Sequence, residues 1–478
     1  MKIPRHTFRE YDIRGVADRD LSDDLMTAIG RGFAAMIRAG GGGGAGSQPA
    51  WREGMSAPRI AVGRDGRLSS ERIFHALTAG LREGGANVVA IGIGPTPMLY
   101  FAAHHLDTDG AMMITGSHNP APDNGVKMMR GKRSFFGQDI QALGNLLERE
   151  DFVFPGASEP LHGSFTEQHL ELAYIDAIRS ASRIAHTRIR FVVDAGNGAA
   201  GPLGLATLRA LGYSPDPLFC EMDGNFPNHH PDPTVPANLE ALRQRVLETG
   251  AELGLAWDGD GDRLGAMDHT GAIVWGDKLL LLFARALLLD NPGAAILGEV
   301  KCSETLYADI AARGGRPIIW KTGHSLIKTK MKEEGALLAG EMSGHLFFAD
   351  RYFGYDDAIY AAIRLLEIIA RQRCSLRDLL ADVPETFVTP EIRVDCPDAI
   401  KFQVVARVLA HYRETHKVLD IDGARIDFEN GAWGLCRASN TQAVLVLRFE
   451  ADTEARRDVI RNEVETVVAR AVLAEGMA

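Results

Sequence analysis

The sequence lacks several features that would set it apart from ordinary compact proteins. Its five cysteines are scattered with no C-x-x-C pair, which favours reduced structural thiols over a disulfide framework. The longest near-apolar run, residues 279–289, contains Arg285 and predicts a buried helix, not a membrane span. The opening MKIPRHTFREYDIRG has no apolar h-region, so we expect no signal peptide and a cytoplasmic protein.

The sequence also has fewer basic than acidic residues. Lysine and arginine number 52 against 63 aspartates and glutamates, a net charge of -11, which argues against nucleic acid or an anionic membrane as partner. Any chemistry on an anion must therefore come from a local basic cluster. The 478 residues suggest roughly three domains, and 46% apolar residues predict compact cores.

Three segments repeat one pattern of apolar strand, small polar turn, amphipathic helix and second strand. Because buried strands alternate with helices of about ten residues, the pattern predicts βαβ units with parallel sheets covered on both faces. The first strands begin at Arg59, Ile189 and Ala294, the helices are expected near 69–83, 203–211 and 304–313, and the second strands begin near Asn87, Asp216 and Arg316.

The chain from about residue 391 has a different order: strand, helix, four strands, helix. That order predicts an α+β domain with a largely antiparallel sheet. We therefore expect domains at 1–163, 164–272, 273–387 and 388–478. Residues 40–58 begin with five consecutive glycines and show no apolar face, which predicts a flexible surface insertion.

The segment WDGDGDR, residues 257–263, alternates aspartate with glycine after an apolar strand. In an extended loop Asp258, Asp260 and Asp262 would point to one side, and three carboxylates favour a hard divalent cation, Mg²⁺ or Ca²⁺. An EF-hand is excluded because positions six and twelve are Arg263 and His269. A solvated acidic turn is the alternative.

The segment ITGSHNPAPDNGVK, residues 114–127, places Ser117 in a loop after the apolar strand AMMIT. An exposed serine beside His118 and near Lys127 is a candidate nucleophile or phosphoryl carrier. Acyl transfer is not favoured, because no G-x-S-x-G elbow surrounds this serine. The alternative is a turn serine that caps a neighbouring amide.

Two further motifs carry polar side chains suited to a ligand. GEMSGH alternates acceptors and donors that suit sugar hydroxyls, with glycines that permit close approach. RASNT, in an expected loop between two strands, combines a guanidinium with neutral donors as a phosphate cradle would. Satisfied polar turns are the alternative for both. Weaker candidates are Lys301 after a strand, His324 in the KTGHS turn, and Tyr11 and Arg14 in an N-terminal turn.

The ordered motifs FREYDIRG, TGSHNP, DGDGDR, GEMSGH and R-x-S-N-T resemble the α-D-phosphohexomutase family, in its phosphomannomutase/phosphoglucomutase branch. The resemblance covers nearly the whole chain. It implies three related α/β domains, built from βαβ units with mixed sheets, and a smaller C-terminal α+β domain around a central cleft. It also implies reversible transfer of a phosphoryl group between O1 and O6 of a hexose, through a phosphoserine and a 1,6-bisphosphate.

The resemblance gives each motif a role. Ser117 would be the phosphoserine and, through a phosphoryl oxygen, a metal ligand. The other Mg²⁺ ligands would be Asp258, Asp260 and Asp262. Arg263 would steady the transferring group, while His118, Lys127 and, for the other orientation, His324 would assist proton transfer. Substrate-binding residues would be Tyr11, Arg14, Lys301, Glu341, Ser343, His345, Arg437, Ser439, Asn440 and Thr441.

The motifs also narrow the substrate. The glucosamine-phosphate branch shows GEQSGH, so Met342 favours glucose and mannose. A phosphoglucosamine mutase, a metal-dependent sugar phosphatase and a non-catalytic sugar-phosphate binding module remain alternatives. We expect sugar phosphates as partners and glucose 1,6-bisphosphate as activator, and a monomer, because no coiled-coil heptads are present.

Overall fold

The computed structural model describes residues 2–39, 57–149, 162–183, 188–440 and 442–476. Most of the predicted insertion, residues 40–56, lies outside them. The chain divides into two compact units. Unit 1 comprises Met1–Gly276 and Ser343–Asp378, and unit 2 comprises Asp277–Met342 and Leu379–Ala478. Within the described ranges, no helix is both long and apolar enough to cross a bilayer.

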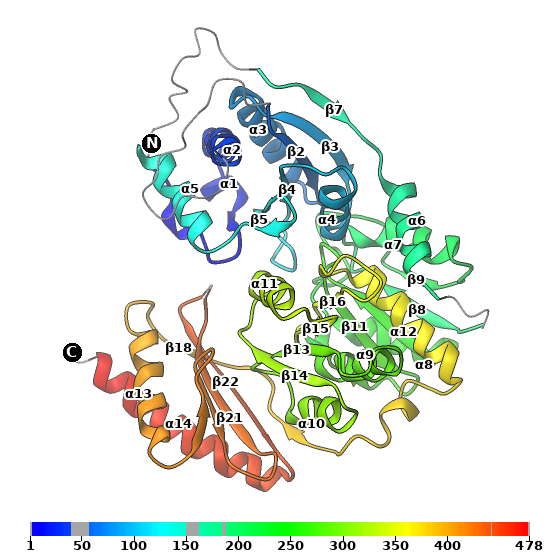
Figure 1. Ribbon diagram of the computed structural model, residues 1–478, viewed down its shortest axis with the longest axis vertical. Helices are drawn as coiled ribbons and strands as arrows, with labels where there is room; N and C mark the ends of the chain where they lie inside the picture. The colour runs from blue at the N-terminus through cyan, green and yellow to red at the C-terminus, as the bar shows by residue number, and fades with distance from the viewer. Residues whose placement is uncertain (1, 40–56, 150–161, 184–187, 441, 477–478) are drawn as a thin grey trace. The chain divides into compact units, whose positions relative to one another are not determined.

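The N-terminal sheet of unit 1 has the strand order β1-β5-β4-β2-β3-β7, with β6 beside β5. At its centre β2 runs parallel to β3 and β4, whereas β5 is antiparallel to β4 and β1 to β5 (Figure 1). The bounds are β1 Ile13–Val16, β2 Arg59–Arg64, β3 Asn87–Ile93, β4 Gly110–Ile114, β5 Asp123–Arg130, β6 Arg133–Ser134 and β7 Phe165–Glu167.

Helices cover this sheet because their apolar faces pack onto its buried strands. Ser22 caps α2 by accepting from the Leu25 amide, and α2 and α3 pack together. The core joins Phe33 of α2, Ile60 and Val62 of β2, and Leu77 of α3. The helices are η1 Arg5–Thr7, α1 Ala17–Asp20, α2 Asp23–Arg38, α3 Ser70–Glu83, α4 Thr96–His105 and α5 Gln138–Arg149.

The second sheet of unit 1 has the order β12-β11-β10-β8-β9. Parallel strands β9, β8 and β10 precede an antiparallel hairpin of β10 and β11. Its strands are β8 Phe191–Asp194, β9 Asp216–Leu218, β10 Leu253–Trp257, β11 Leu264–Asp268 and β12 Ile273–Val274. The helices are α6 Glu171–Ala181, α7 Ala200–Ala210, η2 Pro236–Leu239 and α8 Glu240–Thr249. The later segment of unit 1, residues 343–378, contains α12 Ala358–Gln372 and β16 Leu346–Phe348, which is not a strand of this sheet.

Unit 2 begins with the parallel strands β14, β13 and β15. The predicted buried helix is confirmed as α9, in which most apolar side chains from Leu279 to Leu288 are buried. The elements are α9 Gly276–Asp290, β13 Ala295–Glu299, α10 Glu304–Ala312, β14 Arg316–Trp320, α11 His324–Glu334, β15 Leu338–Gly340 and η3 Asp378–Leu380.

The C-terminal sheet of unit 2 has the order β17-β22-β21-β20-β19, with β18 also on β22 and all pairings antiparallel. Helices α13 and α14 pack on β21. The elements are β17 Phe387–Val388, β18 Ile392–Asp395, α13 Lys401–Arg413, β19 Lys417–Leu419, β20 Ala424–Asp427, β21 Trp433–Ala438, β22 Val444–Ala451 and α14 Glu454–Gly476.

The structure confirms the three predicted βαβ units and the mixed sheets. The strand pairs β2–β3, β8–β9 and β13–β14 are parallel, as expected. The sheets of unit 1 are mixed, as the fold class predicted, because the hairpins β4–β5 and β10–β11 add antiparallel edges to the parallel strands. These two hairpins carry the serine loop and the aspartate loop. All five cysteines are free, and four of them are buried.

Candidate active site

Ser117 lies in the loop that joins β4 to β5, and its backbone has a positive φ of 50°. Residues other than glycine rarely adopt this conformation, so the loop must hold the serine there. The Ser117 amide donates to Thr115 Oγ1 at 2.8 Å. Ser117 Oγ lies 3.1 Å from His118 Nδ1 and 3.3 Å from Asp258 Oδ2. The structure therefore places the candidate nucleophile between an imidazole and the aspartate loop, and the serine is buried, not exposed as we expected.

The three aspartates of the loop between β10 and β11 are fully buried, and one oxygen of each lies within 4.8 Å of the others. They converge through a tight turn, not through the extended alternation that we expected. Asp258 Oδ1 closes that turn by accepting from the amides of Asp262 and Arg263 at 3.0 and 3.1 Å. Gly261 permits it with φ of 76°.

The donor set fits a hard divalent cation. Buried Oδ1 atoms of Asp260 and Asp262 accept no hydrogen bond among the described residues. Buried carboxylate oxygens normally have partners, and clustered ones favour Mg²⁺ or Ca²⁺. Burial and then the charges of Asp262 and Asp260 raise the pKa of Asp258. A cation in this loop would relieve that repulsion.

Lys127, on β5, is the counter-charge of the aspartate loop. Its Nζ donates to Asp260 Oδ2 at 2.6 Å and to Asp262 Oδ2 at 2.5 Å. Burial alone would lower the pKa of Lys127, but the two carboxylates outweigh it and raise the pKa above its ordinary value. The lysine is therefore a cation at neutral pH, and it can donate a proton but not accept one.

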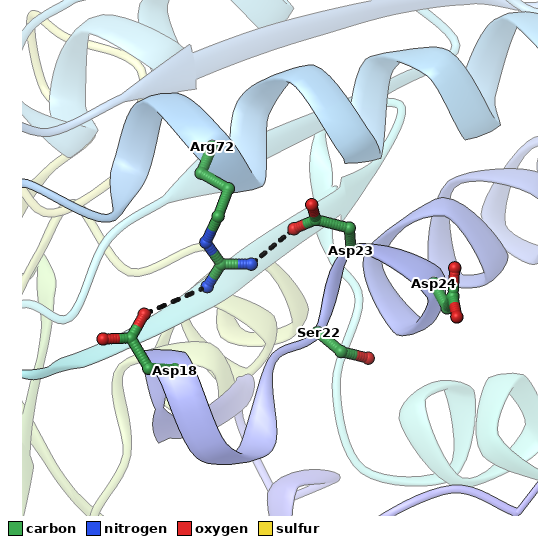
Figure 2. A pocket seen from close by; sticks show the side chains of 5 residues that line it. All are labelled: Asp18, Ser22, Asp23, Asp24 and Arg72. Atoms are coloured by element: carbon green, nitrogen blue, oxygen red, sulfur yellow. Dashed lines mark hydrogen bonds and ion pairs between the residues drawn. The ribbon is translucent and has the colours of Figure 1, made fainter.

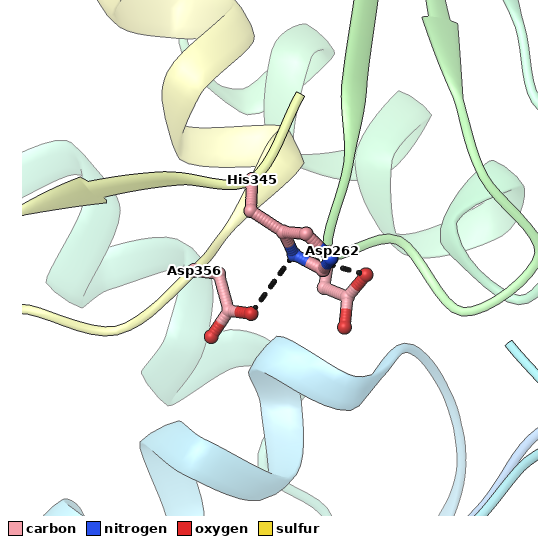
Figure 3. A group of neighbouring side chains, drawn as sticks. All are labelled: Asp262, His345 and Asp356. Carbon is pink, nitrogen blue, oxygen red and sulfur yellow. Dashed lines mark ion pairs between the residues drawn. The ribbon is translucent and has the colours of Figure 1, made fainter. Parts of the chain in front are cut away.

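His345 lies between Asp262 of the aspartate loop and Asp356, as Figure 3 shows. Its Nδ1 lies 3.0 Å from Asp356 Oδ2 and 3.6 Å from Asp262 Oδ1. Arg263 Nε donates to its Nε2 at 3.0 Å, so the ring proton belongs on Nδ1, facing Asp356. The structure thus places His345, which we expected to bind sugar, against Arg263 and Asp356.

His118 and Arg14 surround the serine loop. Burial, and then the charges of Arg263, Arg14 and Lys127, lower the pKa of His118 well below its ordinary value, so its ring is neutral. Arg14, expected in a turn, lies on β1 instead, and it donates to Asn119 Oδ1 at 2.7 Å. Half-buried Tyr11 precedes that strand.

Unit 2 holds two of the candidates, Glu341 and Lys301, in a network of carboxylates. Glu341 accepts from the Gly323 amide at 2.6 Å, next to His324, which begins α11. Lys301 Nζ lies 3.2 Å from Glu391 Oε2 and 3.6 Å from Glu299 Oε1. The neighbouring Ser343 of the GEMSGH motif is half-buried and belongs to unit 1.

The RASNT motif starts within strand β21, not in a loop as expected. Arg437 pairs with Val446 across the sheet, and its Nε donates to Asp422 Oδ2 at 2.9 Å. The same carboxylate accepts from the Thr322 amide at 3.0 Å. Ser439 and Asn440 follow the strand end, and Thr441 lies outside the described residues.

A surface hollow elsewhere in unit 1 carries no candidate residue. It is lined by Asp18, Ser22, Asp23, Asp24 and Arg72, and the arginine pairs with Asp23 at 2.5 Å (Figure 2). Its acidic lining is unsuited to phosphate.

The sequence reasoning missed several residues that hold the site. Thr96 Oγ1 donates to Asp260 Oδ2 at 2.5 Å, and Asp356 orients His345. Asp422 and Asn119 likewise bind candidate arginines. Asp65 and Arg67 follow the first strand of a βαβ unit, where functional residues gather, and this position could have pointed to them.

Comparison with known proteins decides the family. Family models described as phosphoglucomutase/phosphomannomutase match four consecutive stretches: alpha/beta/alpha domain I at residues 5–153, domain II at 172–271, domain III at 275–387, and the C-terminal domain at 391–467. The chain belongs to the phosphoglucomutase/phosphomannomutase family. This confirms the family and the fold class that the motifs predicted.

Full-length relatives agree with this family. A phosphomannomutase/phosphoglucomutase of Pseudomonas putida is 44% identical over 470 residues, 98% of this chain and 96% of the relative. Its namesake in Pseudomonas aeruginosa is 44% identical over 471 residues, 97% and 96% of the two chains. A crystal structure of a family protein from Burkholderia thailandensis matches with TM-score 0.88, 39% identity and 98% coverage of both chains.

Proposed function

We propose that this family member is a phosphohexomutase that interconverts the 1-phosphates and 6-phosphates of glucose and mannose through a phosphoserine at Ser117. The observation that carries the proposal is the position of Ser117 Oγ, 3.3 Å from the first aspartate of the triad and 3.1 Å from a neutral histidine. Family membership and full-length relatives named phosphomannomutase/phosphoglucomutase support the same reaction.

The reaction consists of two transfers in opposite directions. In the first, the bond from Ser117 Oγ to phosphorus breaks and a bond from the free sugar hydroxyl to phosphorus forms. The hydroxyl gives up its proton, and the serine oxygen takes one up. The resulting 1,6-bisphosphate then returns its other phosphate to Ser117, and glucose 1,6-bisphosphate from solution would prime a dephosphorylated serine.

The residues around Ser117 suit these proton movements. Neutral His118 can accept the proton of the hydroxyl, whereas positively charged Lys127 can supply one. Arg263, held by His345, would stabilise charge on the transferring group. His324 would assist proton transfer in the second orientation.

The aspartate triad would hold the magnesium. Asp258, Asp260 and Asp262 would be its protein ligands, together with a phosphoryl oxygen on Ser117. When bound, Mg²⁺ would neutralise charge on the phosphoryl oxygens and help to orient the group.

The remaining motifs would bind the substrate. We propose that Glu341 and Ser343 bind sugar hydroxyls, with His345 beside them or acting through Arg263. The phosphate that does not react would be held by Arg437, Ser439, Asn440 and Thr441, and Tyr11, Arg14 and Lys301 complete the set. Met342 favours glucose and mannose over glucosamine.

The organisation of the chain is part of the proposal. We place four domains at 1–163, 164–272, 273–387 and 388–478, supported by the four matched stretches and by the order of elements. All the named residues come from one chain, which suits a monomer. We place the enzyme in the cytoplasm, because charged sugar phosphates do not cross bilayers. Light scattering after gel filtration would test the oligomeric state.

A phosphorus NMR time course tests the function. The enzyme, Mg²⁺ and a trace of glucose 1,6-bisphosphate would be given glucose, mannose or glucosamine 1-phosphate. We expect the first two to become 6-phosphates with little free phosphate. Steady release of phosphate would indicate a phosphatase instead, turnover of glucosamine 1-phosphate alone would indicate the other branch, and binding without turnover would indicate a binding module.

Two variants complete this experiment. Ser117→Ala should abolish turnover, because it removes the oxygen that carries the phosphoryl group. Ser180→Ala is the matched control, since its hydroxyl bonds to the Asp176 carbonyl on the exposed face of α6. Normal turnover by Ser117→Ala would overturn the proposal.

A further inference from the structure

Arg67 is among the largest fully buried side chains of the protein, with 2% of its surface exposed. It lies between β2 and α3, where its Nε donates to Asp65 Oδ2 at 3.1 Å. Buried arginines are rare, and burying a charge is costly unless all of its polar groups are satisfied. A guanidinium kept at this depth therefore calls for a functional reason.

The guanidinium binds the loop that carries Ser117. Its Nη2 donates to the carbonyls of Ser117 and Asn119, each at 2.7 Å. Its Nη1 donates to the carbonyls of Pro120 and Asp123 at 2.7 and 2.9 Å. With Nε on Asp65, all five N–H groups have an acceptor. One planar group thus fixes four carbonyls of the short segment between β4 and β5.

The surroundings leave the guanidinium no alternative position. A Cβ at Gly116 would lie 2.5 Å from Arg67 Cζ, so only glycine fits beside it. The ring of Phe226 covers it, with its centroid 5.0 Å from Cζ. Asp65 Oδ2 also accepts from the Gly116 amide at 3.3 Å, which joins the ion pair to the residue before Ser117.

The Ser117 carbonyl is also packed against the aspartate loop. A Cβ at Gly259 would lie 2.3 Å from that carbonyl oxygen. The carbonyl is thus held between Arg67 and the backbone that separates Asp258 from Asp260. Because Ser117 has a positive φ, its Oγ keeps its direction only while this backbone is held.

We infer that Arg67 is a positioning residue for phosphoryl transfer, which fixes the backbone of residues 117–123 so that Ser117 Oγ faces the aspartate loop. The inference rests on the proposed phosphoserine function. Arg67 touches no reacting atom and acts through carbonyl groups. A misplacement of about 1 Å can cost about 100-fold in rate. The loop geometry therefore controls two rates, which are transfer of the phosphoryl group to the sugar hydroxyl and its loss to water.

Arg67→Lys separates geometry from charge. Lysine keeps the positive charge, but it has three donors on one nitrogen and cannot span four carbonyls and a carboxylate. The matched control is Arg72→Lys, on the following helix α3 (Figure 2). Arg72 also donates to two carbonyls and an aspartate, but it binds a different segment.

The readouts are kcat and KM for glucose 1-phosphate, and the ratio of free phosphate released to 6-phosphate formed. That ratio does not depend on how much protein is folded. For Arg67→Lys we expect kcat to fall about 100-fold, KM to change by less than about 3-fold, and the ratio to rise at least about 10-fold. Arg72→Lys should leave kcat and the ratio unchanged.

Gly116→Ala is the second variant, since its methyl group would displace the guanidinium without altering any charge. It should raise the ratio as Arg67→Lys does, and it stands in if the lysine variant fails to fold. If kcat falls in both variants while the ratio of free phosphate to 6-phosphate stays unchanged, Arg67 is needed only for folding and the inference is overturned. Radiolabelled glucose 1,6-bisphosphate separates the two proposals, because wild-type enzyme that does not label Ser117 refutes the phosphoserine itself.

Discussion

Two charged clusters of opposite sign can be compared, one in each unit. In unit 1, two of three buried carboxylates bind the ammonium of Lys127, and a cation is proposed to bind there. In unit 2, Arg437 pairs with Asp422, and an anion is proposed to bind there. In both, the chain supplies a counter-ion with the charge of the expected ligand. Such internal partners balance the buried charges while no ligand is bound, and so they avoid the cost of an unpaired buried charge.

The clusters differ in how completely the counter-ion is buried. The carboxylates of Asp260 and Asp262 are fully buried and Lys127 is nearly so, whereas 13% of the Asp422 side chain is exposed. A buried pair is strongly coupled and a solvated one weakly. Changes in the acidic cluster should therefore have larger effects than changes in the basic one.

The largest effect is expected for Asp260→Asn. Loss of one carboxylate from the triad should weaken Mg²⁺ binding and lower kcat by at least about 100-fold, because charge on the transferring group is no longer balanced. Isothermal titration with Mg²⁺ or Mn²⁺ and steady-state kinetics measure both. Asp268→Asn, a buried aspartate at the end of the same hairpin that caps a turn, is the control. Unchanged metal affinity in Asp260→Asn would argue against the triad as the metal site.

Lys127→Met should destabilise the metal-free protein by about 3 kcal/mol, since it leaves buried carboxylates without their cation. Added Mg²⁺ should then raise the melting temperature more than it does in wild type, because metal binding to the folded state takes over the missing charge. Thermal melts with Mg²⁺ and with EDTA measure this. An equal rise in melting temperature on adding Mg²⁺ to the two proteins would show that the metal does not bind the carboxylates that Lys127 binds.

Asp357→Asn tests a buried carboxylate of unit 1 whose partners are tyrosine hydroxyls. Burial raises the pKa of Asp357 to about 6, against hydrogen bonds from the Tyr360 amide, Tyr174 and Tyr352 that lower it. Because the pKa is raised in the folded protein, the protonated carboxyl of Asp357 stabilises the fold fully below pH ~4. This stabilisation is lost as pH rises through about 6, and the loss in the free energy of unfolding is at most about 3 kcal/mol. The melting temperature of wild type relative to Asp357→Asn should therefore fall between about pH 4 and pH 6. A difference that does not change with pH would contradict the raised pKa.

The smallest effect is expected for Asp422→Asn. The amide can still accept from the Thr322 amide but no longer neutralises Arg437, so binding of a phosphate should tighten by about 2- to 5-fold. Titration of glucose 1-phosphate into a Ser117→Ala background measures this. Asp420→Asn, which removes an exposed pair with Arg413, is the control. Weaker phosphate binding in Asp422→Asn would mean that the aspartate orients Arg437 for its ligand and does not compete with it.

Much of the fold was predictable because its pattern is local. The strand Arg59–Arg64 and the helix Ser70–Glu83 lie where apolar runs and amphipathic spacing put them. The C-terminal order of strand, helix, four strands and helix is observed from β18 to α14. The sequence did not show which strands run antiparallel, because the direction of β5 and β11 depends on how two hairpins close, and the D-G pairs of the second turn were interpreted as a metal-binding loop.

The sequence by itself determined the family, the residue types of the chemistry and the order of the elements, since motifs and hydrophobic periods are properties of neighbouring positions. Only the tertiary structure decided which distant residues meet. It put Lys127 on Asp260 and Asp262, Asp356 on His345, and Arg67 beneath the Ser117 loop. Except for His345 and Asp356, these contacts join residues 50 or more positions apart, and they depend on how sheets and hairpins pack. The chemistry of the motif side chains could therefore be predicted from the sequence, but the residues that set their charge and orientation could not.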